Sequence, residues 1–248
     1  MLAIIGGTGL TRLRNLQITH RQVIRTQYGE PSGALTFGEI NGQQVVFIAR
    51  HGYGHTIPPH EINYRANITA LAEQKVKRVI SVCAVGGIRD NMPPGTLVLP
   101  HQIIDYTYGR KHTFFEGGDK PVTHIDFTEP YCHELRERIL KAAGASKQAL
   151  IDGGTYAATQ GPRLETGAEI NRIAGDGGDI VGMTGMPEAA LAKEAGLSYA
   201  AIAVVSNWAA GRRESRYEID MDAAESIFDE AIERVHRILE EVVKVDAD

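Results

Sequence analysis

The chain has 248 residues, 43% of them hydrophobic and 23% charged, with a formal net charge of -5. These values are typical of one soluble α/β domain with a sizeable core. The acidic balance and the lack of a Lys/Arg run exclude a broad nucleic-acid-binding face, and no apolar run reaches the length of a membrane span.

Apolar runs alternate along the chain with amphipathic stretches. The apolar runs predict buried strands at 2–5, 45–49, 79–84, 97–99 and 199–205. The amphipathic stretches predict helices at 61–75, 131–143, 166–174, 187–195 and 222–243. This order predicts one α/β domain over residues 1–248, with a central mixed, mostly parallel β-sheet flanked by helices.

Ligand-binding loops are expected at the carboxyl ends of the strands in such a sheet. Two polar segments, 105–128 and 209–218, are predicted to be functional loops, the second of them a lid.

The cysteines and the first residues of the chain indicate the cellular compartment in which we expect the protein. Cys83 and Cys132 have no metal-ligand spacing and are too few for a disulfide framework, which favours a reducing compartment. The apolar segment 1–5 is short and lacks a basic lead, so it does not predict a signal peptide. We therefore expect a cytoplasmic protein with no membrane or nucleic-acid partner.

A glycine-rich segment, Gly6-Gly7-Thr8-Gly9, follows the first predicted strand. Glycines let the backbone approach a phosphate closely, and the Thr8 hydroxyl can add a hydrogen bond. The alternatives are a plain structural turn and an NAD-binding loop of an oxidoreductase. An NAD-binding loop is disfavoured because Arg12 stands where the third glycine of that motif belongs.

Arg50 and His51 follow the second predicted strand. A guanidinium that emerges at a strand end can fork onto a phosphate. A metal site made of His51, His55 and His60 is a weak alternative, since no carboxylate or thiol completes a recognisable set, and we expect no metal.

Two further segments each allow two interpretations. The segment Ala84-Val85-Gly86-Gly87 comes at the end of the third predicted strand, where its backbone amides form either a nest for phosphate or a tight turn. Glu165 precedes a predicted helix, where it either accepts a hydrogen bond from a purine N1–H or lies in the first helical turn, favoured by the helix dipole.

The segment 182–188 reads Gly-Met-Thr-Gly-Met-Pro-Glu and joins a strand to a helix start. Backbone and hydroxyl groups near a helix N-terminus suit an anion. The fifth predicted strand is followed by Ser206 and Asn207, and an amide there both donates and accepts, as the edge of a neutral purine requires. The presence of groups that can bind an anion and groups that can bind a purine base predicts chemistry on a nucleoside.

Several motifs together resemble the trimeric nucleoside phosphorylases, and within them the branch of 5'-methylthioadenosine and 5'-methylthioinosine phosphorylases. The motifs are Ile4-Ile5-Gly6-Gly7-Thr8-Gly9-Leu10, Ala49-Arg50-His51-Gly52, Asn63-Tyr64-Arg65-Ala66-Asn67, Gly161-Pro162-Arg163, and Gly182-Met183-Thr184 with Met186-Pro187-Glu188-Ala189. The resemblance implies a homotrimeric pentosyltransferase in which phosphate attacks C1' of a purine nucleoside. Phosphate is then a co-substrate, and no metal or organic cofactor is needed.

The resemblance also implies roles for individual residues. Phosphate would be held by Thr8, Arg50, His51, Ala84 and Thr184. Met183 would lie against the ribose, and His124 of a neighbouring subunit would close the 5' end. Ile219 and Met221 would face the methylthio group.

The base contacts depart from the methylthioadenosine branch. That branch carries a Thr-Asp-Tyr-Asp run where this chain has Ser-Asn-Trp-Ala at 206–209. An aspartic acid can protonate N7 of a leaving adenine, whereas an amide can only donate a hydrogen bond. The 6-oxopurine phosphorylases similarly have Asn at this position and a Gly-Pro-x-Phe-Glu-Thr run, which Glu165 matches, with Leu164 in place of Phe.

We therefore predict phosphorolysis of a 6-oxopurine nucleoside, with Asn207, Glu165 and Ser206 as the catalytic contacts to the base. Among the family the combination most resembles the enzymes that cleave 5'-methylthioinosine. A methylthioadenosine phosphorylase and a general inosine/guanosine phosphorylase are the alternatives.

Overall fold

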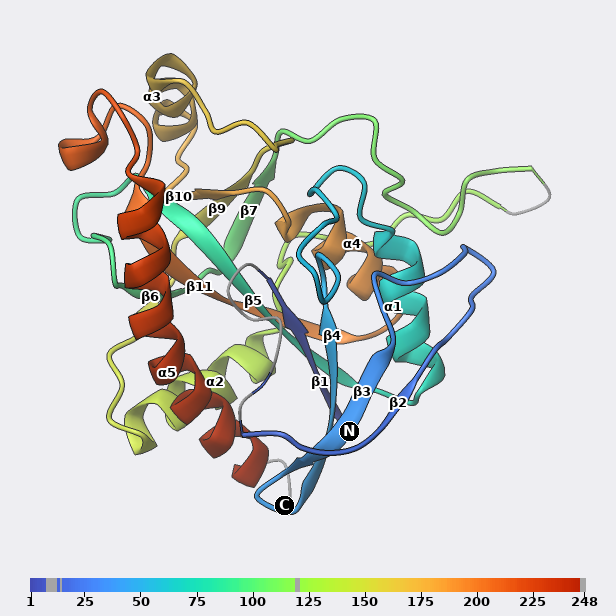
Figure 1. The fold of residues 1–248 in the computed structure, drawn as a ribbon. Helices are drawn as coiled ribbons and strands as arrows, with labels where there is room; N and C mark the ends of the chain where they lie inside the picture. The colour runs from blue at the N-terminus through green and yellow to red at the C-terminus, as the bar shows by residue number, and fades with distance from the viewer. Residues whose placement is uncertain (8–12, 14, 119–120, 246–248) are drawn as a thin grey trace.

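A computed structural model describes residues 1–7, 13, 15–118 and 121–245, so the predicted phosphate ligand Thr8 lies outside the described residues. The fold is built on an eleven-stranded mixed sheet with helices on both faces (Figure 1). The strands are β1 (Leu2–Gly6), β2 (Gln17–Gln22), β3 (Leu35–Ile40), β4 (Gln43–Ala49), β5 (Arg78–Gly87), β6 (Leu97–Leu99), β7 (Gln102–Asp105), β8 (Ile151–Asp152), β9 (Thr155–Ala158), β10 (Ile180–Gly182) and β11 (Ser198–Trp208).

Strand β5 is the branch point of the sheet. The strand order is β2-β3-β4-β1-β5-β10-β9-β7, and β11 also pairs with β5 and continues through β6 to β8. The pairings of β5 with β1 and with β11 are parallel, whereas its pairing with β10 is antiparallel. Strand β1 pairs with the first half of β5 only, so β10 takes its place alongside Gly86 and Gly87.

Four of the five helices cover the sheet in two pairs. They are α1 (Tyr64–Glu73), α2 (His133–Ala145), α3 (Gly167–Gly175), α4 (Gly185–Glu194) and α5 (Met221–Val245). Helices α2 and α5 pack on each other and on β11, and α1 packs on α4, which covers β11 and β9 (Figure 1). The sheet therefore lies between two apolar clusters.

Strand alternation explains how one sheet serves both clusters. In β1, Leu2 and Ile4 belong to the cluster under α2 and α5, whereas Ala3 and Ile5 belong to the other. Successive side chains of a strand point to opposite faces, so a fully buried strand is a continuous apolar run. The same division holds along β11, where 200, 202 and 204 face one cluster and 201, 203 and 205 the other.

These observations confirm the predicted fold class, with all five predicted strands and all five predicted helices present. Six short strands were not predicted: β2, β3, β7, β8, β9 and β10. Within the described ranges, no helix is long and apolar enough to cross a membrane.

The prediction for Gly86 and Gly87 was wrong in both of its forms. Neither a turn nor a phosphate nest forms there, because β5 continues through both glycines and pairs them with Asn207 and Trp208 of β11. A Cβ on Gly87 would lie 2.2 Å from the Met92 carbonyl oxygen. Close packing of the surrounding backbone therefore requires glycine at position 87.

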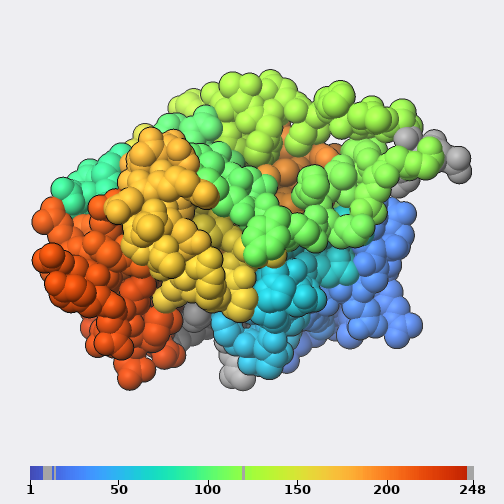
Figure 2. Space-filling view, turned by 90° about the horizontal axis from the view of Figure 1, so that it is seen from above, coloured from blue at the N-terminus to red at the C-terminus, as the bar shows by residue number. Residues whose placement is uncertain are grey.

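The predicted loop 105–128 has no helix or strand beyond Asp105 in the residues that are described. Figures 1 and 2 show the flanks of this segment as a green arm that reaches past the rest of the molecule on one side. The other predicted loop, 209–218, contains a short 3-10 helix at Arg213–Ser215.

Candidate active site

Two of the predicted phosphate ligands, Arg50 and His51, follow β4 at its carboxyl end, beside the end of the parallel strand β1. Ala84 lies inside β5, and Thr184 follows β10, which pairs antiparallel with β5. Gly6 of β1 pairs with Ala49 of β4, and the amide of Arg50 donates to the Gly6 carbonyl at 2.8 Å. A Cβ on Gly7 would lie 2.8 Å from Nη1 of Arg50 and 2.7 Å from the Val82 carbonyl oxygen. Only glycine fits at position 7, and the Arg50 guanidinium lies directly against it.

The Arg50 side chain is fully buried and is held by a carboxylate. Its Nε and Nη2 donate to the two carboxylate oxygens of Glu188 at 2.6 and 2.9 Å. Nη2 also donates to Ser81 at 2.5 Å, and Nη1 to the Val82 carbonyl at 3.3 Å. A forked contact of Arg50 with phosphate is therefore not available, because Glu188 and Ser81 accept from Nε and Nη2, and Nη1 is the atom that faces Gly7.

His51 is nearly buried beside Arg50. Its Nδ1 lies 2.8 Å from the carbonyl oxygen of Ile57, and its ring centroid lies 4.7 Å from that of His55. Burial, with the nearby Arg50 charge, lowers the pKa of His51 to about 4. The neutral ring must donate from Nδ1, because a carbonyl only accepts, so Nε2 carries a lone pair. Across the described positions, no three His, Cys, Asp or Glu side chains gather as metal ligands.

Met183 and Thr184 lie between β10 and α4. Thr184 is buried, its amide lies 3.3 Å from the Tyr156 hydroxyl, and it is the residue at which α4 begins. The Met183 side chain packs on Gly161, where a Cβ would lie 2.4 Å from its sulfur. The turn after β10 is thereby packed against the loop that leads to Glu165.

Ser206 and Asn207 form a β-bulge. The register of β11 against β5 shifts between Val205 and Asn207, and bulges of this kind re-aim a side chain. Nδ2 of Asn207 donates to the Trp208 carbonyl at 2.7 Å, and its Oδ1 accepts from the Ser206 hydroxyl at 2.9 Å. The amide is thus oriented by its own chain neighbours.

Glu165 does not lie in the first turn of a helix. Helix α3 begins at Gly167 behind a Thr166 cap, which forms a capping box with Glu169. Glu165 is half-buried, and its Oε1 accepts from the Thr159 hydroxyl at 2.5 Å. The alternative that the helix dipole holds this carboxylate was therefore wrong.

One cavity brings three of the predicted residues together. It has a volume of about 350 Å³ and is lined by 164–167, 210–211 and 215–219, which include Leu164, Glu165 and Ile219. A Cβ on Gly167 would lie 3.6 Å from Cα of Gly211, so the segment after β11 lies against the start of α3.

Three of the predicted residues are exposed in the single chain, and one of them is Leu164, which is 40% exposed and lines the cavity around Glu165. His124 is exposed in the described stretch 121–128, and 59% of Met221 is exposed at the start of α5. The structure does not place His124 or Met221 among the residues that line the cavity around Glu165.

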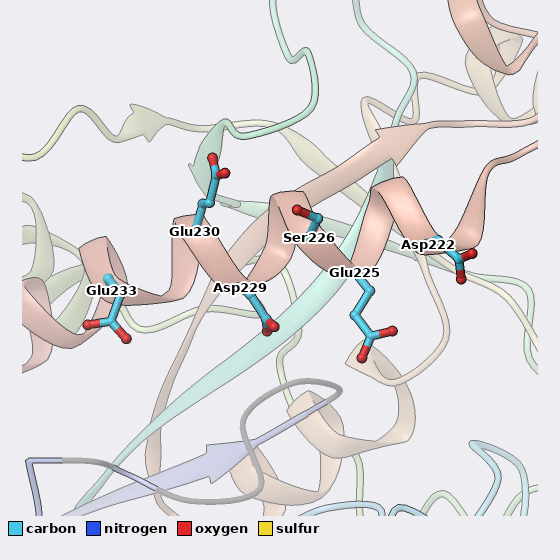
Figure 3. A pocket seen from close by; sticks show the side chains of 6 residues that line it. All are labelled: Asp222, Glu225, Ser226, Asp229, Glu230 and Glu233. Carbon is cyan, nitrogen blue, oxygen red and sulfur yellow. The ribbon is translucent and has the colours of Figure 1, made fainter.

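A larger open groove of about 610 Å³ runs along α5. Figure 3 shows Asp222, Glu225, Ser226, Asp229, Glu230 and Glu233 along this helix. Five carboxylates would repel phosphate, and the groove contains none of the predicted residues. We therefore place the candidate site at the strand ends.

Sequence reasoning missed the role of Glu188. The residue was noted only as part of the Pro-Glu helix start, yet it is 1% exposed and binds Arg50 and the Tyr199 hydroxyl. The available signal was the carboxylate at an apolar helix start, because a carboxylate that is buried there needs a partner.

Comparisons with known proteins identify the family of this chain. The family model described as "Phosphorylase superfamily" matches residues 1–244. A "Probable S-methyl-5'-thioinosine phosphorylase" of Xanthomonas campestris is 48% identical over 98% of this chain and 97% of its own length. A "6-oxopurine nucleoside phosphorylase" of Pyrococcus furiosus is 42% identical over 98% of this chain and 89% of its own length.

The solved structures include methylthioadenosine phosphorylase from Schistosoma mansoni in complex with adenine. It matches with a TM-score of 0.94 and 31% identity, covering 99% of this chain and 91% of its own. The family match spans nearly the whole chain, and the chain belongs to the phosphorylase superfamily.

Proposed function

We propose that this protein is a purine nucleoside phosphorylase that cleaves 6-oxopurine nucleosides, with 5'-methylthioinosine as its preferred substrate. The products are hypoxanthine and 5-methylthioribose 1-phosphate, as expected in purine salvage. The observation that carries the proposal is Asn207, an amide in the bulge at the end of β11 where the methylthioadenosine branch has an aspartate.

The geometry of Asn207 suits a base whose N7 carries a lone pair. One N–H of its amide donates to the Trp208 carbonyl, and the second is available to donate to N7. A phosphate oxygen attacks C1' as the C1'–N9 bond breaks, and the bonding electrons move into the purine. A donor already oriented toward N7 stabilises that developing negative charge.

The proposed contact of Glu165 with the opposite edge of the base favours a 6-oxopurine. Its Oε1 is fixed by Thr159, so Oε2 can accept the N1–H that hypoxanthine carries and adenine lacks. Leu164 and Ile219 line the same cavity and provide the apolar surface that a methylthio group needs.

Phosphate is proposed to bind at the strand ends, against Gly7, Nη1 of Arg50, His51, Ala84, Thr184 and Thr8. Because His51 is neutral and donates from Nδ1, its Nε2 is suited to accept a hydrogen bond from a phosphate hydroxyl. The reaction as proposed uses no metal or organic cofactor.

The names of the relatives support the same substrate class. Relatives named for methylthioinosine and for 6-oxopurine nucleosides are 42% identical or more over nearly all of this chain. The methylthioadenosine phosphorylase structure is 31% identical. The match to the phosphorylase superfamily covers the glycine-rich segment that suggested an NAD-binding loop. It therefore gives no support to an NAD-dependent oxidoreductase.

The deciding experiment is phosphate-dependent base release from methylthioinosine, methylthioadenosine, inosine and adenosine, measured side by side. We expect hypoxanthine from methylthioinosine to form with the highest kcat/KM. Faster release of adenine from methylthioadenosine would contradict the role given to Asn207. Equal rates on inosine and methylthioinosine would instead indicate the general inosine/guanosine phosphorylase.

We also propose a cytoplasmic homotrimer in which His124 of one subunit closes the 5' end of a neighbour's site. His124 is exposed in the stretch 121–128, and Met221 is exposed two positions after the cavity residue Ile219. Light scattering on the purified protein should give three times the chain mass of 27.0 kDa. A monomer with full activity would contradict the proposed role of His124.

A further inference from the structure

Arg110 is a buried arginine outside the residues assigned to the reaction. It lies in the segment between β7 and α2, with 8% of its surface exposed. Its Nε donates to Oε1 of Gln160 at 3.1 Å. Nη1 donates to the carbonyls of Met183 and Met186 at 2.8 and 2.6 Å, and Nη2 to those of Thr159 and Gln160 at 3.2 and 2.7 Å.

The acceptors around this guanidinium are neutral. Four of the six are backbone carbonyls, and the other two are Oε1 of Gln160 and the Tyr64 hydroxyl, which lies 3.2 Å from Nη1. No carboxylate of the described residues forms an ion pair with Arg110. A buried charge without a carboxylate is unfavourable unless its donors are satisfied, and only the planar guanidinium presents five donors in a fixed fork.

The two sets of carbonyls belong to the two halves of the candidate site. Thr159 and Gln160 begin the loop that leads to Glu165, and the Thr159 hydroxyl itself binds that carboxylate. Met183 and Met186 flank Thr184, the proposed phosphate ligand. The Met186 carbonyl is available because its residue has φ -120° and ψ 139°, outside the helical range.

We propose that Arg110 is a positioning residue that fixes the loop 159–165, which reads the base, relative to the turn 183–186, which holds ribose and phosphate. This inference rests on the proposed function. The reaction requires the phosphate oxygen, C1' and the base to be held in line, and a misplacement of about 1 Å can reduce the rate by about 10²-fold. The hydrogen bonds of the Arg110 side chain join the two segments directly.

The kinetic test compares Arg110→Lys, which keeps the charge, with Arg110→Gln, which removes it. We expect both variants to lower kcat for methylthioinosine by about 10²-fold, with smaller changes in KM, because neither can make five fixed hydrogen bonds. Lys111→Gln is the matched control, since it removes a charge from the neighbouring, exposed residue that pairs with Glu116. Wild-type kcat in Arg110→Lys would overturn the proposal.

Chemical rescue separates the planar fork from a general loss of stability. Arg110→Ala should regain part of its activity in millimolar guanidinium chloride and none in ammonium chloride. Equal recovery in the two salts would show that charge alone matters and would also overturn the proposal.

Amide hydrogen exchange tests the same inference without activity. In Arg110→Gln, exchange should accelerate in 159–165 and in 183–186 and stay unchanged in α5, relative to Lys111→Gln. Unchanged exchange in both segments would overturn the positioning role. A wild-type protein inactive on all four nucleosides would instead overturn the proposed function, and the exchange result would still decide the role of Arg110.

Discussion

The carboxylate of Glu188 accepts two hydrogen bonds from the guanidinium of Arg50, of 2.6 and 2.9 Å. Neither residue is more than 1% exposed. The two residues lie 138 positions apart, on α4 and just after β4. This pair connects the helix that follows the proposed ribose turn to the strand end that faces Gly7. It orients the arginine so that Nη1, rather than the Nε edge, lies against the proposed phosphate site.

The first prediction concerns this pair. Glu188→Ala should lower the free energy of unfolding by about 3–5 kcal/mol, because it leaves the buried Arg50 charge without a partner. Tyr199→Phe is the matched control. It removes one hydrogen bond to Glu188, of 2.7 Å, and should cost about 1 kcal/mol. Urea denaturation measures both, and a Glu188→Ala value no larger than that of the control would contradict the account.

The second prediction concerns Asn207. Asn207→Ala should lower kcat/KM on 6-oxopurine nucleosides by about 10²-fold, the scale of losing one donor to the transition state. Asn207→Asp should shift the preference toward 6-aminopurines, because a carboxylic acid can protonate N7. Steady-state kinetics on methylthioinosine and methylthioadenosine measure both effects. Near-unchanged kinetics in Asn207→Ala, or no relative gain on methylthioadenosine in Asn207→Asp, would exclude the role.

The third prediction concerns Glu165. Glu165→Gln should lower kcat/KM on methylthioinosine by about 10- to 100-fold, because a hydrogen bond to a charged acceptor contributes about 1.5–3 kcal/mol. The effect on methylthioadenosine should be smaller, since adenine has no N1–H to donate. Glu169→Gln removes a nearby carboxylate that pairs with Arg163 and should leave substrate preference unchanged. Equal losses on both nucleosides would argue against base reading by Glu165.

The fourth prediction concerns the pH dependence of stability. The pKa of His51 is lowered to about 4, so the folded protein binds its proton less readily than the unfolded chain. The free energy of unfolding should therefore be highest above about pH 6.5. It should fall between about pH 6.5 and 4 with a slope of about 1.4 kcal/mol per pH unit from this group.

His51→Asn tests this slope, because an asparagine can donate to the Ile57 carbonyl and cannot titrate. Denaturation curves between pH 7.5 and 4.5 should show a shallower fall in His51→Asn than in the wild type. His133→Asn, on the surface of α2, is the control and should retain the wild-type slope. Identical slopes in wild type and His51→Asn would show that the buried histidine is not the titrating group.

Local patterns in the sequence determined the main elements and the family. The apolar runs of β1, β4, β5, β6 and β11 and the stripe on α5 are visible because strand and helix periodicities are properties of neighbouring residues. The motifs around Arg50, Glu165 and 182–188 carried the resemblance that the family match supports. The two-residue strand β8 escaped prediction because it is too short to form an apolar run.

The tertiary structure alone decided how the site is held together. Gly86 and Gly87 extend β5 because β10 and β11 pair with them from both sides, which no local pattern shows. The Glu188 carboxylate meets Arg50 because α4 packs back onto the sheet, and Arg110 meets its carbonyls for a similar reason. Such contacts join residues far apart in the chain. They are set by packing, because burial of each charge is tolerated only where the fold provides its partners.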